Sequence, residues 1–296
     1  MKQDIITKKG LKEKSIAYQI PFANLLEGFL RETLMFQILE EDFSKNLWLK
    51  NRDCFTLDTY KKEWQKPLHF VYKQEKRKTG QPDDAETLKQ FFRNLGQKRE
   101  DHVRWDVSVE TKDDYQMIYI TGEWEEMKVP ITLCVTPMLY EMIIPEKQEL
   151  CSLFYEKKCV QYEYFPLDIY LAEQLFAIIK YMELIPSMEV YETVCNMLKR
   201  ETIDGRHIFE TIEFLCRKEG MAIDMQRIHM LESYKDYTYM KKRWEKYEKT
   251  REKKSDLCPW EDVIESIHAF LSPIWQAVCR DEVFFGDWMP DLGRYL

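Results

Sequence analysis

The sequence predicts an α+β fold, in which a mixed sheet with helices is followed by an all-helical domain. Short runs rich in β-branched residues fall in the first half of the chain, between polar turns. Apolar residues at helical spacing dominate the second half. The character changes around Pro166, so we expect an α/β domain over residues 1–162 and a helical domain over residues 163–296.

The first expected elements are a long helix and two strands. Apolar residues recur at helical spacing from Phe22 to Leu39, which predicts a helix. The segment from Ser44 to Leu49 predicts the entry to a short strand. Leu68–Tyr72, with the sequence LHFVY, is rich in residues that favour β-structure and predicts a second strand.

A second helix and a meander of three strands complete the expected N-terminal domain. Apolar residues again recur at helical spacing from Leu88 to Leu95, after a charged loop that ends at Pro82. Polar turns separate the β-branched runs that follow, which favours antiparallel neighbours. These runs are residues 103–109, 116–122 and 129–136.

Four amphipathic helices are expected after Pro166. Their apolar residues are spaced as one face of a helix requires. The residues that mark the four faces are Leu171, Leu175, Ile178, Ile179 and Met182; Val190 to Leu198; Ile208, Ile212 and Leu215; and Val263, Ile264, Ile267, Leu271, Ile274 and Val278. The aromatic segment Val283–Pro290 is expected to pack against its own domain.

The composition describes a folded, acidic protein. The apolar fraction is 45% and the formal net charge is -8, which disfavours a chain whose whole surface wraps nucleic acid. No run of about 18 apolar residues occurs and no signal-peptide pattern follows Met1, so we expect a cytoplasmic protein without membrane contact. The eight cysteines form no Cys-x-x-Cys pair, which predicts buried, reduced thiols.

Three segments carry a resemblance to a known family. Phe29–Glu32 contains a Leu-Arg-Glu sequence in a helix before a strand, and Leu47–Lys50 matches the end of that strand. Ala172–Leu175 matches the start of a later helix. In their order along most of the chain, these segments resemble the AbiEii/AbiGii abortive-infection toxin family of nucleotidyltransferases. The resemblance implies a nucleotidyltransferase-like mixed sheet in the N-terminal domain.

The residues that the family uses for chemistry are replaced at the matching positions. Asn51 and Arg52 stand in place of two glycines, Pro67 and His69 in place of two acids, Cys134 in place of a third acid, and Gln174 in place of a lysine. Two acids at alternate positions of a strand reach the same Mg²⁺ ions, which neutralise a triphosphate. Proline offers no ligand, neutral imidazole binds magnesium poorly, and a thiol is too soft. We therefore expect no catalytic residues and no metal site.

The resemblance thus predicts a non-catalytic nucleotide-, RNA- or protein-binding member of a bacterial defence or toxin–antitoxin system, with a cognate protein as a possible further partner. The first alternative is an active, Mg²⁺-dependent nucleotidyltransferase that modifies RNA or protein. It requires relocated acids, and the candidates are Asp53, Asp58 and Asp106. The second alternative is an unrelated structural or interaction protein.

A basic stretch from Lys241 to Lys254 supplies candidate contacts with nucleic acid. Basic residues outnumber acidic ones there, and two aromatic residues are interleaved with them. Cationic side chains pair with phosphates, and aromatic rings stack on bases. The candidate nucleotide- or nucleic-acid-binding residues are Lys50, Arg52, Lys242, Arg243, Trp244 and Tyr247. The alternative is a solvated helix face whose aromatic residues dock on the core.

Overall fold

The chain forms two compact units, residues Met1–Pro166 and Leu167–Leu296. The structure is a computed structural model that describes residues 6–51, 54–61, 66–74, 84–97, 102–141, 143–250 and 257–296. The boundary expected after residue 162 falls inside strand β7 (Cys159–Tyr164), which belongs to the sheet of the first unit. The division therefore follows Pro166.

The first unit contains a seven-stranded mixed sheet with the order β3-β4-β5-β2-β1-β7-β6. Its other strands are β1 (Leu47–Leu49), β2 (Leu68–Tyr72), β3 (Val103–Thr111), β4 (Gln116–Trp124), β5 (Met127–Pro137) and β6 (Glu146–Cys151). The expected antiparallel meander is confirmed as β3, β4 and β5. Strand β2 is parallel to β5, and β1 is antiparallel to β2 and parallel to β7. The sheet is therefore mixed, as predicted.

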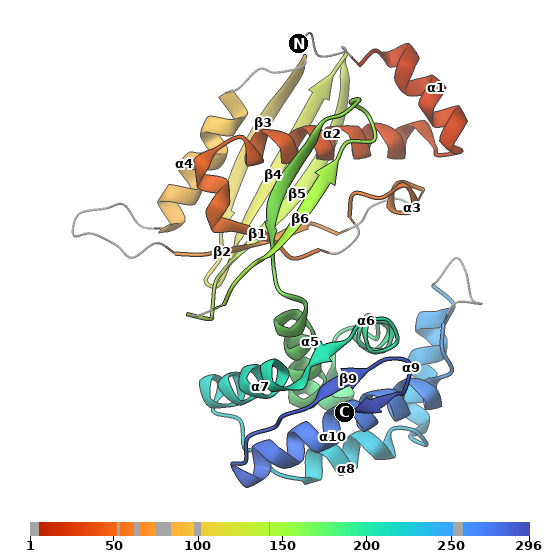
Figure 1. The fold of residues 1–296 in the computed structure, drawn as a ribbon. Coiled ribbons are helices and arrows are strands. Elements are labelled where there is room, and N and C mark those ends of the chain that lie inside the picture. The colour runs from red at the N-terminus through yellow and green to blue at the C-terminus, as the bar shows by residue number, and fades with distance from the viewer. Residues whose placement is uncertain are drawn as a thin grey trace, which may run out of the picture. The chain divides into compact units, whose positions relative to one another are not determined.

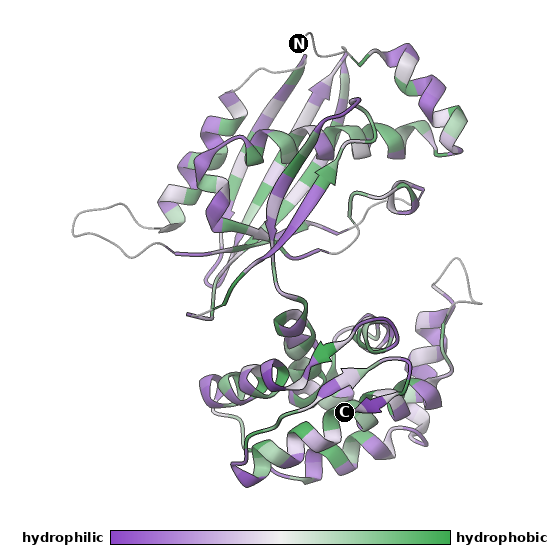
Figure 2. Cartoon of the chain, viewed as in Figure 1, coloured by the Kyte–Doolittle hydropathy of each residue, from purple (hydrophilic) through white to green (hydrophobic). Residues whose placement is uncertain are grey.

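Four α-helices accompany this sheet in the described part of the first unit. They are α1 (Lys8–Tyr18), α2 (Phe22–Leu39), α3 (Leu57–Tyr60) and α4 (Asp84–Gln97). Figure 1 shows α2 crossing one face of the sheet, and Figure 2 shows hydrophobic residues along its length. The expected strand entry at Ser44 is wrong, because Asp42–Asn46 forms a 3-10 helix. The Ser44 backbone N–H donates to the Glu41 carbonyl, so it is satisfied locally.

Helix α2 is buried on almost every side. Phe29 is fully buried, and its ring lies 5.1 Å from Trp124 and 5.4 Å from Phe154, measured between ring centroids. Each large apolar side chain that is fully buried contributes about 1.5–3 kcal/mol through the hydrophobic effect. The burial also removes polar groups of α2 from water, so those groups need hydrogen-bond partners inside the protein.

Two buried polar residues of α2 connect distant parts of the first unit. Glu32 accepts hydrogen bonds from the Tyr60 hydroxyl at 3.0 Å and from the Ser152 hydroxyl at 2.7 Å. Gln37 accepts a hydrogen bond of 2.6 Å from the Trp105 indole N–H. Helix α3, the loop after β6 and strand β3 are therefore each tied to one helix.

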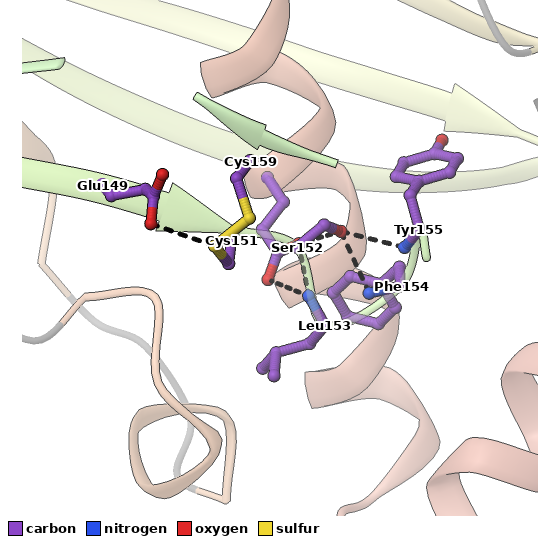
Figure 3. The surroundings of a disulfide bond; sticks show 8 residues. Glu149, Cys151, Ser152, Leu153, Phe154, Tyr155 and Cys159 are labelled. Carbon is purple, nitrogen blue, oxygen red and sulfur yellow. Dashed lines mark hydrogen bonds between the residues drawn. A yellow bond between two sulfur atoms is a disulfide. The ribbon is translucent and has the colours of Figure 1, made fainter. Parts of the chain in front are cut away.

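A disulfide between Cys151 and Cys159 corrects the expectation that all eight thiols are reduced. The two residues face each other at the end of the β6–β7 ladder, with their Cα atoms 4.1 Å apart. Figure 3 shows the loop that they close, in which the Ser152 hydroxyl accepts from the backbone N–H groups of Phe154 and Tyr155. The remaining cysteines, Cys54, Cys134, Cys195, Cys216, Cys258 and Cys279, are not disulfide-bonded.

The second unit is mainly helical and also contains a small sheet. The four expected helices correspond to α5 (Leu167–Tyr181), α6 (Glu189–Leu198), α7 (Gly205–Glu219) and α10 (Trp260–Arg280). Two further helices are α8 (Gln226–Ser233) and α9 (Thr238–Glu248). The sheet, which sequence analysis did not anticipate, has the order β10-β9-β8 and consists of β8 (Ile203–Asp204), β9 (Asp287–Met289) and β10 (Arg294–Tyr295). None of the helices among the described residues has the length and hydrophobicity to cross a membrane.

The aromatic C-terminal segment packs partly inside its own unit. Trp288 on β9 is buried, and its ring centroid lies 5.2 Å from that of Phe270 on α10. Its indole N–H donates to the Leu198 carbonyl at 2.8 Å. Phe285 remains exposed. The expected intramolecular packing is therefore confirmed for Trp288 and not for Phe285.

The stability of the first unit should depend on pH through Glu32. Burial raises the pKa of Glu32 from 4.5 to about 7, so the folded state holds this proton over a pH range in which the unfolded state has lost it. The stabilisation is fully present below pH 4.5 and is lost as the pH rises to about 7. Over this pH range the free energy of unfolding should fall by about 3 kcal/mol.

Urea unfolding of the wild type and of Glu32→Gln, followed across this pH range, checks the expectation. All other groups titrate alike in both proteins, so the difference between their free energies of unfolding isolates Glu32. The wild type should lose stability relative to the variant as the pH rises. A difference that does not change with pH would contradict the role assigned to this carboxyl group.

Candidate functional site

The residues at the family-matched positions of β1, β2 and β5 lie on the face of the sheet opposite the core. Side chains alternate between the two faces of a strand. The core side packs Leu49, Phe70 and Leu133 together with α2. Their neighbours Lys50, His69 and Cys134 therefore point to the other side, which we call the second face.

Strand pairing brings three of these residues into one row across the second face. The Lys50 backbone N–H donates to the His69 carbonyl at 2.8 Å, and His69 is in register with Cys134 on the parallel strand β5. The His69 imidazole Nε2 lies 3.0 Å from the hydroxyl of Thr136, two positions further along β5. His69 and Cys134 are therefore cross-strand neighbours, and the row also includes Thr136, which sequence analysis did not single out.

Asn51 has a structural function at the start of β2. Its side-chain amide N–H donates to the Pro67 carbonyl at 3.3 Å, and its side-chain oxygen accepts from the His69 backbone N–H. A glycine at this position would supply neither hydrogen bond. Asn51 therefore joins the ends of β1 and β2 where the family would leave room for a phosphate. Arg52 lies outside the described residues.

The His69 side chain of this row is uncharged at neutral pH, and the positive charge of Lys50 lies near it. Burial, together with the smaller effect of the Lys50 charge, lowers the pKa of His69 from 6.5 to about 4. Burial raises the pKa of the Cys134 thiol, while the same lysine acts in the opposite direction. The imidazole and the thiol are therefore uncharged at neutral pH and lie in the field of the Lys50 ammonium.

An acid that sequence analysis missed lies on the second face. Tyr162 and Tyr164 of β7 pack toward the core, so Glu163 between them points the other way. The register of Leu49 with Tyr164 places Glu163 beside β1. Its Oε2 atom is buried and has no hydrogen-bond partner among the described residues. The alternation of aromatic residues along β7 is the sequence signal that would have identified this acid.

Two of the acids proposed for a relocated metal site, Asp58 and Asp106, lie on separate elements of the described chain. Asp106 is exposed on β3 opposite Thr121 of β4, and β4 and β5 separate it from β2. Asp58 is exposed on α3 and forms an ion pair of 2.7 Å with Lys61. Asp53 lies outside the described residues.

A carboxylate cage is absent from the part of the chain that the structure describes. There, the one group of three potential metal ligands within 4.8 Å of one another is Glu149, Cys151 and Cys159. The two cysteines are bonded to each other, so their sulfur atoms are not thiolate ligands. The described residues therefore bring no three acids together around one possible metal position.

The candidate residues Gln174, Lys242, Arg243, Trp244 and Tyr247 belong to the second unit. Trp244 is only 5% exposed, its indole N–H donates to the Cys258 carbonyl at 3.3 Å, and its ring packs 5.4 Å from that of Trp260. A ring buried in this way has no open face for a base, which argues against the predicted stacking role of Trp244.

The residues around Trp244 also make internal contacts. The guanidinium of Arg243 donates to the carbonyls of Glu183, at 2.6 Å, and Ile185. The Tyr247 hydroxyl donates to the carboxylate of Glu192. Lys242 is exposed, and Gln174 is partly buried on α5. The described part of the basic stretch therefore fits the alternative of a helix whose aromatic residues dock on the core.

Comparisons with known proteins found similarity to solved structures. No protein-family model matches the sequence, and no curated protein matches it. The chain is similar to JHP933 from Helicobacter pylori, with 9% identity and a TM-score of 0.47, over 86% of this chain and 94% of that chain. It is also similar to a "putative nucleotidyltransferase" from H. pylori, with 10% identity and a TM-score of 0.45, over 87% and 99% of the two chains. The AbiEii/AbiGii resemblance stays a prediction.

The charge state of His69 can be followed by its NMR titration. The imidazole should stay neutral down to about pH 4, because burial and the charge of Lys50 both disfavour the imidazolium form. Its depressed pKa contributes stability that is present above pH 6.5 and is lost as the pH falls to about 4. In Lys50→Met, the pKa of His69 should rise. An unchanged titration in this variant would show that Lys50 does not act on the row.

The packing of Trp244 predicts a large effect on stability. Trp244→Ala should lower the free energy of unfolding of the second unit by about 3–5 kcal/mol, because it removes a buried indole and leaves a cavity. Lys242→Met changes an exposed neighbour and should stay within about 0.5 kcal/mol of the wild type. Urea unfolding followed by circular dichroism compares the two. Equal stability of both variants would refute the assignment of Trp244 to the core.

Proposed function

We propose that the chain is a catalytically inactive, nucleotidyltransferase-like protein that binds a nucleotide through the second face of its first unit. The row of Lys50, His69 and Cys134 is the observation that carries this proposal. At the positions where the resembled family holds metal-binding acids, the row offers a neutral imidazole and a neutral thiol beside a lysine. A role in bacterial defence or in a toxin–antitoxin system follows from the family resemblance and is part of the proposal.

The absence of catalysis follows from the donor set. Metal-assisted nucleotidyl transfer needs hard oxygen ligands that hold divalent ions against the triphosphate. Pro67, His69 and Cys134 supply no carboxylate to the row. Asn51 also accepts the hydrogen bond from the His69 backbone N–H, so this donor is already occupied.

Binding of an anion is supported by the electrostatics of the same row. The positive charge of Lys50 acts on both His69 and Cys134, so a cation lies within reach of the row. The Lys50 ammonium lies 4.9 Å from the ring centroid of Phe165. A phosphate placed here would pair with the ammonium. No metal ion is needed for that contact.

Glu163 favours a second candidate function, an active transferase with a relocated acid. Its buried Oε2 has no hydrogen-bond partner among the described residues, and it lies on the second face beside β1. Magnesium is held in many phosphoryl-transfer sites by one or two carboxylates together with substrate phosphates. Glu163 would supply one such ligand, and a second carboxylate has no counterpart in the row.

Nucleotide binding without metal tests the leading proposal. We expect ATP or GTP to bind the full chain in the presence of EDTA, as measured by isothermal titration calorimetry. Lys50→Met should weaken binding by roughly tenfold or more, since a hydrogen bond to a charged group contributes about 1.5–3 kcal/mol. Lys128→Met removes an exposed lysine of β5 and serves as the matched control. Absence of binding, or equal losses in both variants, would refute the proposal.

A transfer assay separates the two candidate functions. The protein is incubated with labelled nucleoside triphosphates, Mg²⁺ or Mn²⁺ and bulk tRNA, and incorporated label is counted. The leading proposal predicts no incorporation above background. Incorporation that disappears in Glu163→Gln and persists in Asp106→Asn would instead establish the active transferase.

A further inference from the structure

Two cysteines and a lysine lie close together in the second unit. None of them belongs to the proposed nucleotide site of the first unit. Lys199 caps the end of α6, and its ammonium donates to the sulfur of Cys258 at 2.7 Å. Cys258 lies just before α10 and is half-buried. A cationic neighbour of this kind stabilises negative charge on sulfur, and the thiolate is the nucleophilic form of cysteine.

A second thiol lies next to Cys258. Cys195 precedes Lys199 by one turn of α6, so the two side chains share one face of the helix. Burial, together with the smaller effects of the charge of Cys258 and of a hydrogen bond with it, raises the pKa of the Cys195 thiol to about 12. Cys195 is buried, whereas Cys258 is partly accessible. The pair thus consists of an accessible thiol beside a lysine and a protonated thiol behind it.

The segment that carries Cys258 is held in place at Cys258 itself and at Trp260. The carbonyl of Cys258 itself accepts from the Trp244 indole N–H at 3.3 Å. Two residues later, the Trp260 indole N–H donates to the Tyr234 carbonyl at 2.7 Å, and its ring packs 5.1 Å from that of Tyr191. Buried aromatic residues thereby fix the position of the thiol relative to α6.

Cys279 offers a comparison within the same unit. It is also half-buried, but burial raises the pKa of its thiol and the negative charge of Asp224 acts in the same direction. Its environment therefore disfavours the thiolate. The two cysteines differ in the sign of the charge beside them, which predicts a difference in reactivity.

We propose that Cys258 is a redox-active thiol that reacts with hydroperoxides, and that Cys195 converts the product into a disulfide. In the first step the sulfur of Cys258 attacks one peroxide oxygen, a sulfur–oxygen bond forms and the oxygen–oxygen bond breaks. The oxygen that leaves is hydroxide for hydrogen peroxide and alkoxide for an organic hydroperoxide, and it takes up the thiol proton to give water or an alcohol. In the second step the sulfur of Cys195 attacks that of Cys258, and the sulfenic hydroxyl leaves as water with the Cys195 proton. Both thiols are oxidised and the peroxide is reduced.

Peptide mapping of the full chain tests the proposal without any substitution. The protein is treated with hydrogen peroxide, quenched with N-ethylmaleimide, digested without reductant and analysed by mass spectrometry. We expect a peptide pair joined through Cys195 and Cys258, and loss of free thiol at Cys258 several-fold faster than at Cys279. If Cys258 reacts no faster than Cys279, or does not become joined to Cys195, the proposal is overturned.

Variants then assign the two roles. In Cys195→Ser, Cys258 should accumulate as a sulfenic acid that dimedone traps, because the resolving thiol is missing. Lys199→Met should slow oxidation of Cys258 several-fold, and Lys199→Arg, which keeps the charge, should restore much of the rate. Cys279→Ser is the control and should leave the Cys195–Cys258 bridge unchanged. Oxidation of Cys258 at the wild-type rate in Lys199→Met would overturn the role of the lysine.

Discussion

Burial of helix α2 against the sheet is the interaction on which the first unit depends. The helix supplies a continuous apolar surface centred on Phe29, and it carries buried polar residues that cannot be left without partners. Glu32 satisfies this requirement through α3 and the loop after β6, and Gln37 does so through β3. The burial of apolar side chains of α2 thus provides most of the stabilising free energy of this contact. The hydrogen bonds of Glu32 and Gln37 determine which segments lie next to the helix.

The packing of α2 against one face of the sheet explains why the two faces differ: one is apolar core, and the other carries the candidate site. The core face is committed to α2, so chemistry can be carried only by side chains that alternate onto the second face. On that face β1, β2 and β5 place Lys50, His69 and Cys134 in one row. Desolvation there keeps imidazole and thiol neutral, while the lysine supplies the charge. The same backbone pairing that stabilises the sheet therefore fixes the electrostatic character of the site.

Elements with a strong periodic pattern were predictable from the sequence. The helix Phe22–Leu39 and the strand Leu68–Tyr72 have the expected bounds, because each shows the apolar spacing of its own secondary structure. Strands β8, β9 and β10 are too short to show any alternation. The Cys151–Cys159 pair depends on the register of β6 with β7, which no local pattern contains. In the candidate site, His69 and Cys134 could be placed on neighbouring strands once the strands at Leu68–Tyr72 and at residues 129–136 were expected. Glu163 could not be identified in this way, because the sequence does not say which face of β7 is buried.

Strand β1 lies in the middle of the sheet, although it is among the shortest strands of the first unit. It pairs with β2 shortly after it in the sequence and with β7 near the end of the unit, where Leu49 meets Tyr164. Contacts between residues so far apart in sequence form late, because a long loop must close before they contribute any energy. During synthesis, the sheet can be completed only after Tyr164 has left the ribosome. Until then the edge of β1 that pairs with β7 is without its partner strand, and an unpaired edge of this kind can pair with another chain.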